Sequence, residues 1–252
     1  MKKFSLFLFL ALGLLAMSAH LSAQTSYALC VGLSKCGTPG AEDISHPQHD
    51  AADLKKVLAK QGYKVGAVTN KHATRSNILD RVSRIVKAAK SPDDKILLYI
   101  ATHGDDGVLL TYGGEVIKYS ELIDILSQSK TRHIYCFVMA CHSGSALSSM
   151  STDADWATNA NKWGITFVVS CRPNEYSFSS GVPHWRHSYF GQAIIKGLRG
   201  QADRNDDRQV TLMELFRYTY NEVTGRSGQG EDAQHPQLIG PKGEHDTVLA
   251  RW

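Results

Sequence analysis

The sequence predicts an α/β fold: a three-layer sandwich with a mostly parallel central sheet and helices on both faces. Short apolar runs typical of buried strands alternate with segments whose apolar residues recur at helical spacing. Strands that alternate with helices in this way form βαβ units, which give a parallel sheet covered on both sides. A chain of 252 residues is long enough for one such domain with a full core.

The first half of the chain is expected to hold three strands and two helices. The strands are expected over 27–33, 63–69 and 95–101. The first of them is expected to be the central one. The helices are expected over 49–61, where Gly62 is a stop signal, and over 74–89, where Thr74 is a capping residue.

The second half continues the same alternation, with a hairpin and a linker added. The expected elements are a hairpin over 108–117, a helix over 120–127, strands over 134–140 and 164–170, and helices over 188–198 and 211–223. A last short strand is expected over 247–250, in a tail that is otherwise loop-like from 225 onwards. Residues 145–163 are poor in periodic apolar residues and indicate an internal linker.

The first 23 residues have the pattern of a secretory signal peptide. Lys2 and Lys3 precede an apolar run from Phe4 to Met17, and small residues follow. The run is too short for a membrane span, and no later stretch is apolar enough for one. The expected organisation is therefore a signal peptide over 1–23 and one domain over 24–252, secreted or periplasmic.

The net charge argues against two classes of binding partner, and the number of cysteines limits the disulfides. The leader holds two of the 28 basic residues and none of the 24 acidic ones, so the rest of the chain carries +2. That charge is too small to indicate binding to nucleic acid or to an anionic membrane. Five cysteines leave at least one unpaired. No disulfide is expected, and Cys30 with Cys36 is the local alternative.

Two side chains with complementary chemistry follow neighbouring predicted strands. Cys141 follows the strand over 134–140, and His103 follows the strand over 95–101. Parallel neighbours place both at the same edge of the sheet, where an imidazole can activate a thiol as a nucleophile. The amides of Cys141 and Gly104 are candidates for an oxyanion hole. By itself, Cys141 is better explained as a buried structural thiol, and its pairing with His103 is what favours catalysis.

His142 is adjacent to the candidate nucleophile but is not expected to act on it. Neighbouring side chains of an extended backbone point to opposite faces. We therefore expect His142 to have a structural role.

At these residues the sequence resembles a known family. Ala101-Thr102-His103-Gly104 and Ala140-Cys141-His142-Ser143-Gly144 are similar to motifs of the caspase-like peptidases of clan CD, within them the bacterial metacaspases and orthocaspases (peptidase C14). The resemblance runs from about residue 27 to residue 223. It implies the caspase–hemoglobinase-like form of the sandwich and an endopeptidase that cleaves peptides or proteins with a His103/Cys141 dyad. No cofactor is required for that chemistry.

The resemblance also implies cleavage after Arg or Lys, through acidic residues in the substrate pocket. Asp50 matches one such residue, although a helix N-terminus also favours an acidic side chain there. Met139 stands where the family has a second pocket Asp, and Ala101 where it has a small hydroxyl residue. Glu175 is either the second acid or a solvated loop charge. Basic specificity is therefore a hypothesis that depends on Asp50.

A second motif indicates calcium. Asp203, Asn205, Asp207 and Glu214 have the spacing of EF-hand ligands. Arg208 departs from the pattern, because it replaces the glycine of the sharp turn. Thr211 and Glu214 also form a capping-box pattern, which explains two of these residues without a cation.

Two other functions are compatible with the sequence. A non-catalytic caspase-homology module would bind peptide or protein partners, and the altered residues Met139 and Ala101 favour it weakly. A hydrolase or transferase acting on a non-peptide amide would use the same dyad. If the chain processes itself within the linker, Lys162 is the expected cleavage site. The sequence makes no prediction about the oligomeric state.

Overall fold

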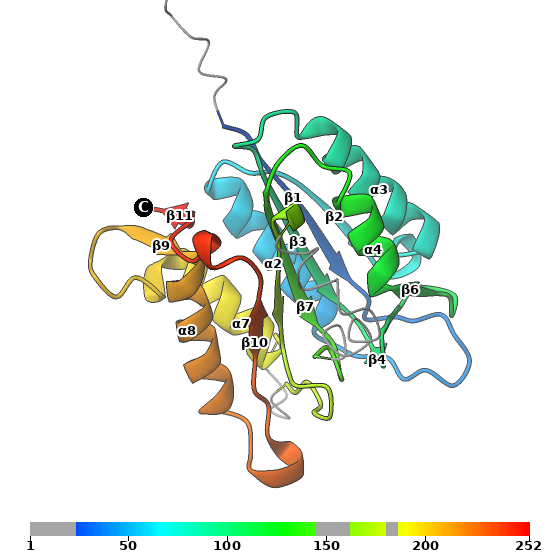
Figure 1. Ribbon diagram of the computed structural model, residues 1–252. Helices are drawn as coiled ribbons and strands as arrows, with labels where there is room; N and C mark the ends of the chain where they lie inside the picture. Colours follow the sequence, from blue (N-terminus) through cyan, green and yellow to red (C-terminus); the bar gives the residue numbers. More distant parts are fainter. Residues whose placement is uncertain (1–23, 145–161, 180–185) are drawn as a thin grey trace, which may run out of the picture.

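A six-stranded sheet forms the centre of the protein (Figure 1). The computed structural model describes residues 24–144, 162–179 and 186–252; the predicted signal peptide and nearly all of the predicted linker lie outside them. The strand order is β10-β8-β7-β3-β1-β2, with β10 antiparallel and the other five parallel. The strands are β1 (Ser26–Gly32), β2 (Lys64–Thr69), β3 (Lys95–Ala101), β7 (His133–Met139), β8 (Ile165–Val169) and β10 (Gln237–Ile239).

Helices cover both faces of this sheet, which confirms the predicted fold class. Helices α2 (Pro47–Lys60), α7 (Tyr189–Lys196) and α8 (Leu212–Thr224) lie on one side, and α3 (Arg75–Ala88) and α4 (Tyr119–Leu126) on the other (Figure 1). The side chains of each strand alternate between two hydrophobic cores. On β3, Leu97, Tyr99 and Ala101 belong to the core under α2 and α7, whereas the intervening residues belong to the other core.

The helices begin where their sequences favour a start. The Thr74 hydroxyl accepts a hydrogen bond from the Asn77 amide at the start of α3, as predicted. Ser188 caps α7 through the Gly191 amide (2.8 Å). Thr211 and Glu214 form the predicted capping box at the start of α8.

Short elements complete the domain. Strands β4 (Gly104–Asp105), β5 (Val108–Leu110) and β6 (Val116–Lys118) form a small antiparallel sheet, and β9 (Gln209–Thr211) pairs with β11 (Val248–Arg251). The short helical turns are η1 (Asn70–His72), η2 (Gly197–Gln201), η3 (Gly230–Asp232) and η4 (Lys242–Glu244). The hairpin was predicted; the additional strand β4, which begins immediately after His103, was not.

Two expectations about strand placement were wrong. Strand β1 is not central, because β3 and β7 occupy the middle and β1 lies beside the edge strand β2. The tail before the last strand is not loop-like throughout, since β10 closes the sheet against β8. The expected last strand is present as β11 and pairs with β9. These strands of three or four residues carry no periodicity of their own, and their pairing depends on distant partners.

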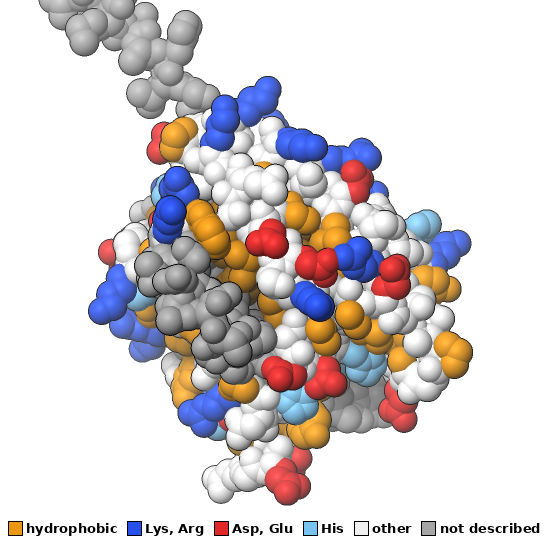
Figure 2. Space-filling view, turned by 45° about the vertical axis from the view of Figure 1, so that its right-hand side comes forward, with side chains coloured by type: hydrophobic (Ala, Val, Ile, Leu, Met, Phe, Trp, Pro, Cys, Tyr) orange, Lys and Arg blue, Asp and Glu red, His pale blue; other side chains and the backbone are white. Residues whose placement is uncertain are grey.

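The thiols and the surface charges match what the sequence predicts. All five cysteines are unpaired, so the local Cys30–Cys36 disulfide is not formed. No helix among the described residues has the length and apolar character needed to cross a membrane. On the face shown in Figure 2, acidic and basic side chains are interspersed.

A buried polar cluster anchors the C-terminal segment to the amino end of β7. The Glu244 carboxylate accepts hydrogen bonds from His133 Nδ1 (2.9 Å), the Tyr135 hydroxyl (2.5 Å) and the Thr247 hydroxyl (3.1 Å). The bond to Glu244 raises the pKa of His133. Burial alone would raise the pKa of Glu244, but the bonds from His133 and Tyr135 outweigh it, and the net pKa is lowered.

This pair is expected to stabilise the fold most strongly at mildly acidic pH. The contribution of Glu244 is present above its ordinary pKa of 4.5 and is lost on acidification. The contribution of His133 is present below its ordinary pKa of 6.5 and is lost as the pH rises through the higher folded-state value. We expect Glu244→Gln to lower the free energy of unfolding by about 1 kcal/mol, most at about pH 5–6. Urea unfolding of both proteins from pH 4 to 9 measures this, and a difference independent of pH would contradict it.

Candidate active site

The structure brings His103 and Cys141 to the same edge of the sheet. Strands β3 and β7 are parallel neighbours, and Ala101 pairs with Met139 at their carboxyl ends. The Thr102 amide donates to the Met139 carbonyl (3.1 Å), which extends the pairing beyond β3. His103 and Cys141 each lie two residues past the last pair, and adjacent strands are spaced by about 4.8 Å. The two candidate residues therefore lie on neighbouring strand ends.

Gly104 allows the two strand ends to approach closely. A Cβ atom at this position would lie 2.6 Å from the Cys141 carbonyl oxygen and 2.8 Å from the Ala140 Cβ. Real Cβ contacts are not that short, so any larger residue would push the segments apart. The glycine is thus required for the contact between the His-Gly and Cys-His-Ser-Gly segments.

A backbone carbonyl fixes the orientation of the His103 ring. Nε2 lies 2.6 Å from the carbonyl oxygen of Glu42, in the loop between β1 and α2. A carbonyl can only accept, so Nε2 carries the proton and donates it, which leaves Nδ1 as an acceptor. Glu42 could not be identified from the sequence, because a backbone carbonyl has no side-chain signature.

The Cys141 thiol is half-buried and lies among backbone amides. Burial raises its pKa above the ordinary thiol value. The amide of Ser177 and the amide of Cys141 itself act in the opposite direction, since both donate toward the sulfur. The net pKa is raised, so the resting residue is a neutral thiol at neutral pH and requires a base to become a nucleophile. This contact from the Ser177 amide to the Cys141 sulfur could not be predicted from the sequence either.

A tightly packed turn holds Cys141 in place. Cys171 is completely buried beneath it, with Sγ 3.3 Å from the Ala140 carbonyl oxygen. The Cys171 amide donates to the Ser143 hydroxyl (3.3 Å). A Cβ at Gly144 would lie 2.5 Å from the Pro173 nitrogen, so this segment also packs backbone to backbone. The candidate nucleophile therefore lies on a closely packed support.

His142 has contacts of its own, away from the dyad. Its Nδ1 donates to the Pro173 carbonyl (2.8 Å), and its ring contacts Tyr176 with centroids 4.9 Å apart. These contacts support the structural role that was expected. The reason given for it was wrong, however, because the chain is not extended at His142 but turns with a φ of 53°.

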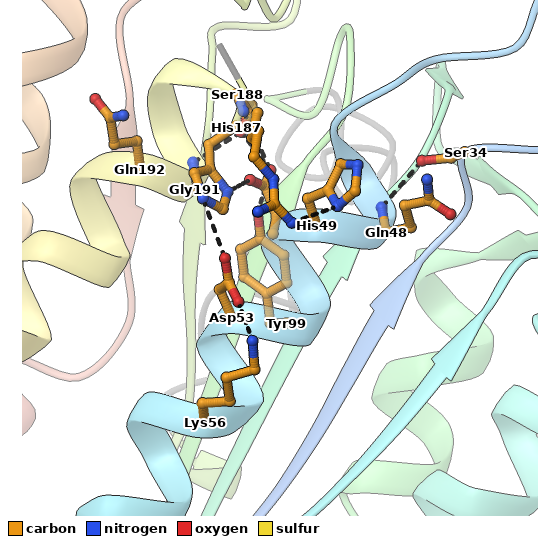
Figure 3. Close-up of polar contacts among 12 residues, drawn as sticks. Ser34, Gln48, His49, Asp53, Lys56, Tyr99, His187, Ser188, Gly191 and Gln192 are labelled. Carbon is orange, nitrogen blue, oxygen red and sulfur yellow. Dashed lines mark hydrogen bonds and ion pairs between the residues drawn. The ribbon is translucent and has the colours of Figure 1, made fainter. Parts of the chain in front are cut away.

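Asp50 lies at the centre of a closed polar cluster between α2 and α7. Its carboxylate is fully buried and accepts hydrogen bonds from the Tyr99 hydroxyl (3.1 Å), the Ser188 hydroxyl (2.7 Å) and His187 Nδ1 (2.8 Å). Figure 3 shows Tyr99, His187 and Ser188 converging there. Gly191 closes the remaining side, since a Cβ there would be 2.3 Å from the carboxylate. A cationic substrate group would therefore have to replace a donor that is already bound.

The other predicted substrate-binding residues do not present a free carboxylate. Ala101 and Met139 are buried in the core under α2 and α7. Glu175 is 9% exposed, and its carboxylate accepts from His235 Nδ1 (2.6 Å) and from the Arg172 amide (3.1 Å). The assignment of these three residues to substrate binding stays a prediction.

The predicted calcium ligands form a tight turn before α8. Asp203 accepts from the Arg208 amide (3.0 Å), and Arg208 has a φ of 62°, the left-handed conformation that glycine would adopt more easily. Asp207 accepts from the Gln209 amide (2.8 Å), and Asn205 donates to Asp207 (3.2 Å).

Glu214, the last predicted ligand, is used by the capping box. It accepts from the Thr211 amide (3.0 Å) and hydroxyl (2.9 Å). Within the described part of the chain, no group of three or more His, Cys, Asp or Glu side chains could hold a metal ion. Calcium binding stays a prediction, and activity that does not change with calcium or a chelator would contradict it.

Comparisons with known proteins identify the family and the fold. A family model described as Caspase domain matches residues 25–242. The crystal structure of protein GSU0716 from Geobacter sulfurreducens has a similar fold, with a TM-score of 0.65 and 16% sequence identity, over 90% of this chain and 99% of that one. No curated protein matches the sequence. At that identity the structural likeness concerns the fold alone.

Proposed function

Because this chain belongs to the caspase-domain family, we propose that it is a cysteine endopeptidase that hydrolyses peptide bonds in peptides or proteins. Cys141 is the nucleophile, and His103 is the general base and acid. One observation carries the proposal: the two side chains follow the carboxyl ends of the parallel neighbours β3 and β7. No cofactor is required for this chemistry.

The proton moves through Nδ1 of His103. Nε2 is already bound to the Glu42 carbonyl, so Nδ1 takes the thiol proton as the Cys141 sulfur attacks the substrate carbonyl carbon. The carbon–nitrogen bond then breaks, and the leaving amine takes that proton. Water, deprotonated by the same nitrogen, hydrolyses the thioester and returns the thiol. The raised pKa of Cys141 makes this base necessary at the moment of attack.

The oxyanion is expected to form against backbone amides. Those of Gly104 and Cys141 belong to the two segments in contact at the site. Preorganised amides at such a position stabilise the tetrahedral intermediate without reorganisation.

An irreversible thiol-directed peptide inhibitor tests the proposal. We expect a mass addition on Cys141 in the wild-type protein and its loss when His103 or Cys141 is replaced by alanine. Binding of peptides without turnover or labelling would favour the non-catalytic module instead. Turnover of a non-peptide amide, without peptide cleavage, would favour the third function considered above.

Cleavage after Arg or Lys is a separate hypothesis that is not part of this proposal, because Asp50 is its only support. Ala101 and Met139 are apolar, and the Glu175 carboxylate is bound to His235. A basic side chain of the substrate could therefore bind only the Asp50 carboxylate, and only after His187 has moved away from it. Cleavage profiling with a peptide library tests this preference.

Export and self-processing are further proposals that rest on the sequence. The basic and apolar pattern of residues 1–23 supports a secreted or periplasmic protein. Lys162, near the end of the predicted linker, is exposed, as a processing site would be. Determining the N-termini of the chain recovered from cells tests both, because cleavage after Lys162 would create a second N-terminus.

A further inference from the structure

The side chain of Asp43 closes the loop that orients the His103 ring, and the mechanism proposed above gives it no role. The Glu42 carbonyl accepts one hydrogen bond from His103 Nε2 (2.6 Å) and another from the buried Cys36 thiol (3.6 Å). The next residue, Asp43, turns its carboxylate back into the loop, where Oδ1 accepts from the Cys36 amide (3.2 Å) and Oδ2 from Lys35 Nζ (2.8 Å). Asp43 thus ties the segment that carries Glu42 to the opposite side of the loop.

The two sides of the loop are anchored unequally. The Lys35–Cys36 side is fixed to the body of the protein: Asn70 accepts from the Lys35 amide (3.0 Å), and the Cys36 carbonyl accepts from the Gly113 amide (3.0 Å). The side with Glu42 and Asp43 is exposed. It is tied back by the two bonds of Asp43, by the Ile44 amide (3.0 Å to the Ser34 carbonyl) and by the Cys36 thiol, which donates to the Glu42 carbonyl (3.6 Å). The Cys36 amide is itself bound by Asp43, so the position of the Glu42 carbonyl depends on Asp43 both directly and through Cys36.

We propose that Asp43 is a positioning residue for His103. By holding the Glu42 carbonyl against Nε2, it selects the ring tautomer and orientation that leave Nδ1 free to take the Cys141 proton. This inference rests on the proposed function. Without such a role, Asp43 is only the exposed acidic partner of Lys35 in a surface ion pair. Such pairs contribute little to stability, so an effect of Asp43 on turnover would have to act through the loop.

Substitution of Asp43 tests the inference by separating turnover from binding and folding. We expect Asp43→Ala to lower kcat by roughly 10- to 100-fold, with KM and the melting temperature nearly unchanged. Asp43→Asn keeps an oxygen that accepts from the Cys36 amide, and we expect it to recover most of kcat although the charge is lost. Lys35→Ala leaves that hydrogen bond in place and is expected to be close to wild type.

Asp80→Ala is the matched control. Asp80 is an equally exposed aspartate (51% against 49% for Asp43), and it is paired with Arg84 on α3. We expect wild-type kcat for this variant. Equal kcat for Asp43→Ala and Asp80→Ala, or a loss in Asp43→Ala that asparagine does not recover, would overturn the inference.

A second readout does not depend on a peptide substrate. The rate at which iodoacetamide alkylates Cys141, followed by peptide mass, is expected to fall in Asp43→Ala toward the rate of His103→Ala. If the wild type does not cleave peptides, the proposed function fails, and the alkylation rates still decide the role of Asp43. Equal alkylation rates in wild type and Asp43→Ala would overturn it.

Discussion

Peptide hydrolysis is expected to disappear when Cys141 is replaced by alanine, with a fall in kcat/KM of roughly 10⁴-fold or more. The covalent route requires the sulfur, and no other described cysteine has the same combination of partial exposure and a neighbouring imidazole. His103→Ala is expected to lower kcat/KM by roughly 10²- to 10⁴-fold, because the neutral thiol then loses its base. Steady-state kinetics on one cleaved peptide measures both effects.

Cys136→Ala is the matched control for this prediction. Cys136 lies on β7, the strand that Cys141 follows, but it is fully buried, and its pKa is raised by burial alone. Its loss is expected to cost some stability and to leave kcat of the folded fraction unchanged. Hydrolysis that survives in Cys141→Ala, or that disappears equally in Cys136→Ala, would show that the dyad is assigned incorrectly.

The placement of His103 and Cys141 on neighbouring strand ends could be predicted because both residues follow strong sequence signals. His103 and Cys141 each end an apolar run, and the segment between the two runs is long enough for a crossover between parallel strands. The structure confirms the parallel pairing, with Ala101 opposite Met139. The fold class follows from the same alternation of runs and helical segments.

The contacts around His103 and Cys141 could not be predicted in the same way. Glu42 and Ser177 contribute a carbonyl and an amide, and every residue has these groups, so no residue type marks them. The partners of Asp50 are also invisible in the sequence, because His187 and Ser188 are more than 130 residues away and meet it only after α2 and α7 pack together. A motif identifies the side chain, whereas the fold decides which bonds it makes.

The second large effect is expected at Asp50, and it concerns stability more than selectivity. Asp50→Ala leaves the Tyr99 and Ser188 hydroxyls and the His187 imidazole without their acceptor in a buried site. Leaving a buried network unpaired in this way costs about 3–5 kcal/mol. For a domain of this size the melting temperature should fall by about 10 °C, which thermal unfolding measures.

Two variants separate this structural role from recognition of a basic substrate. Asp53 also faces His187 (3.4 Å to Nε2) but is partly exposed and paired with Lys56, so Asp53→Ala should cost less than about 1 kcal/mol. Asp50→Asn keeps the shape and an acceptor but removes the charge. If Asp50 binds Arg or Lys of the substrate, Asp50→Asn loses that preference at nearly wild-type stability. We instead expect Asp50→Asn to be less stable and to have an unchanged cleavage profile. The three side chains that donate to this carboxylate are part of the packed domain, so the carboxylate is used in holding the structure together.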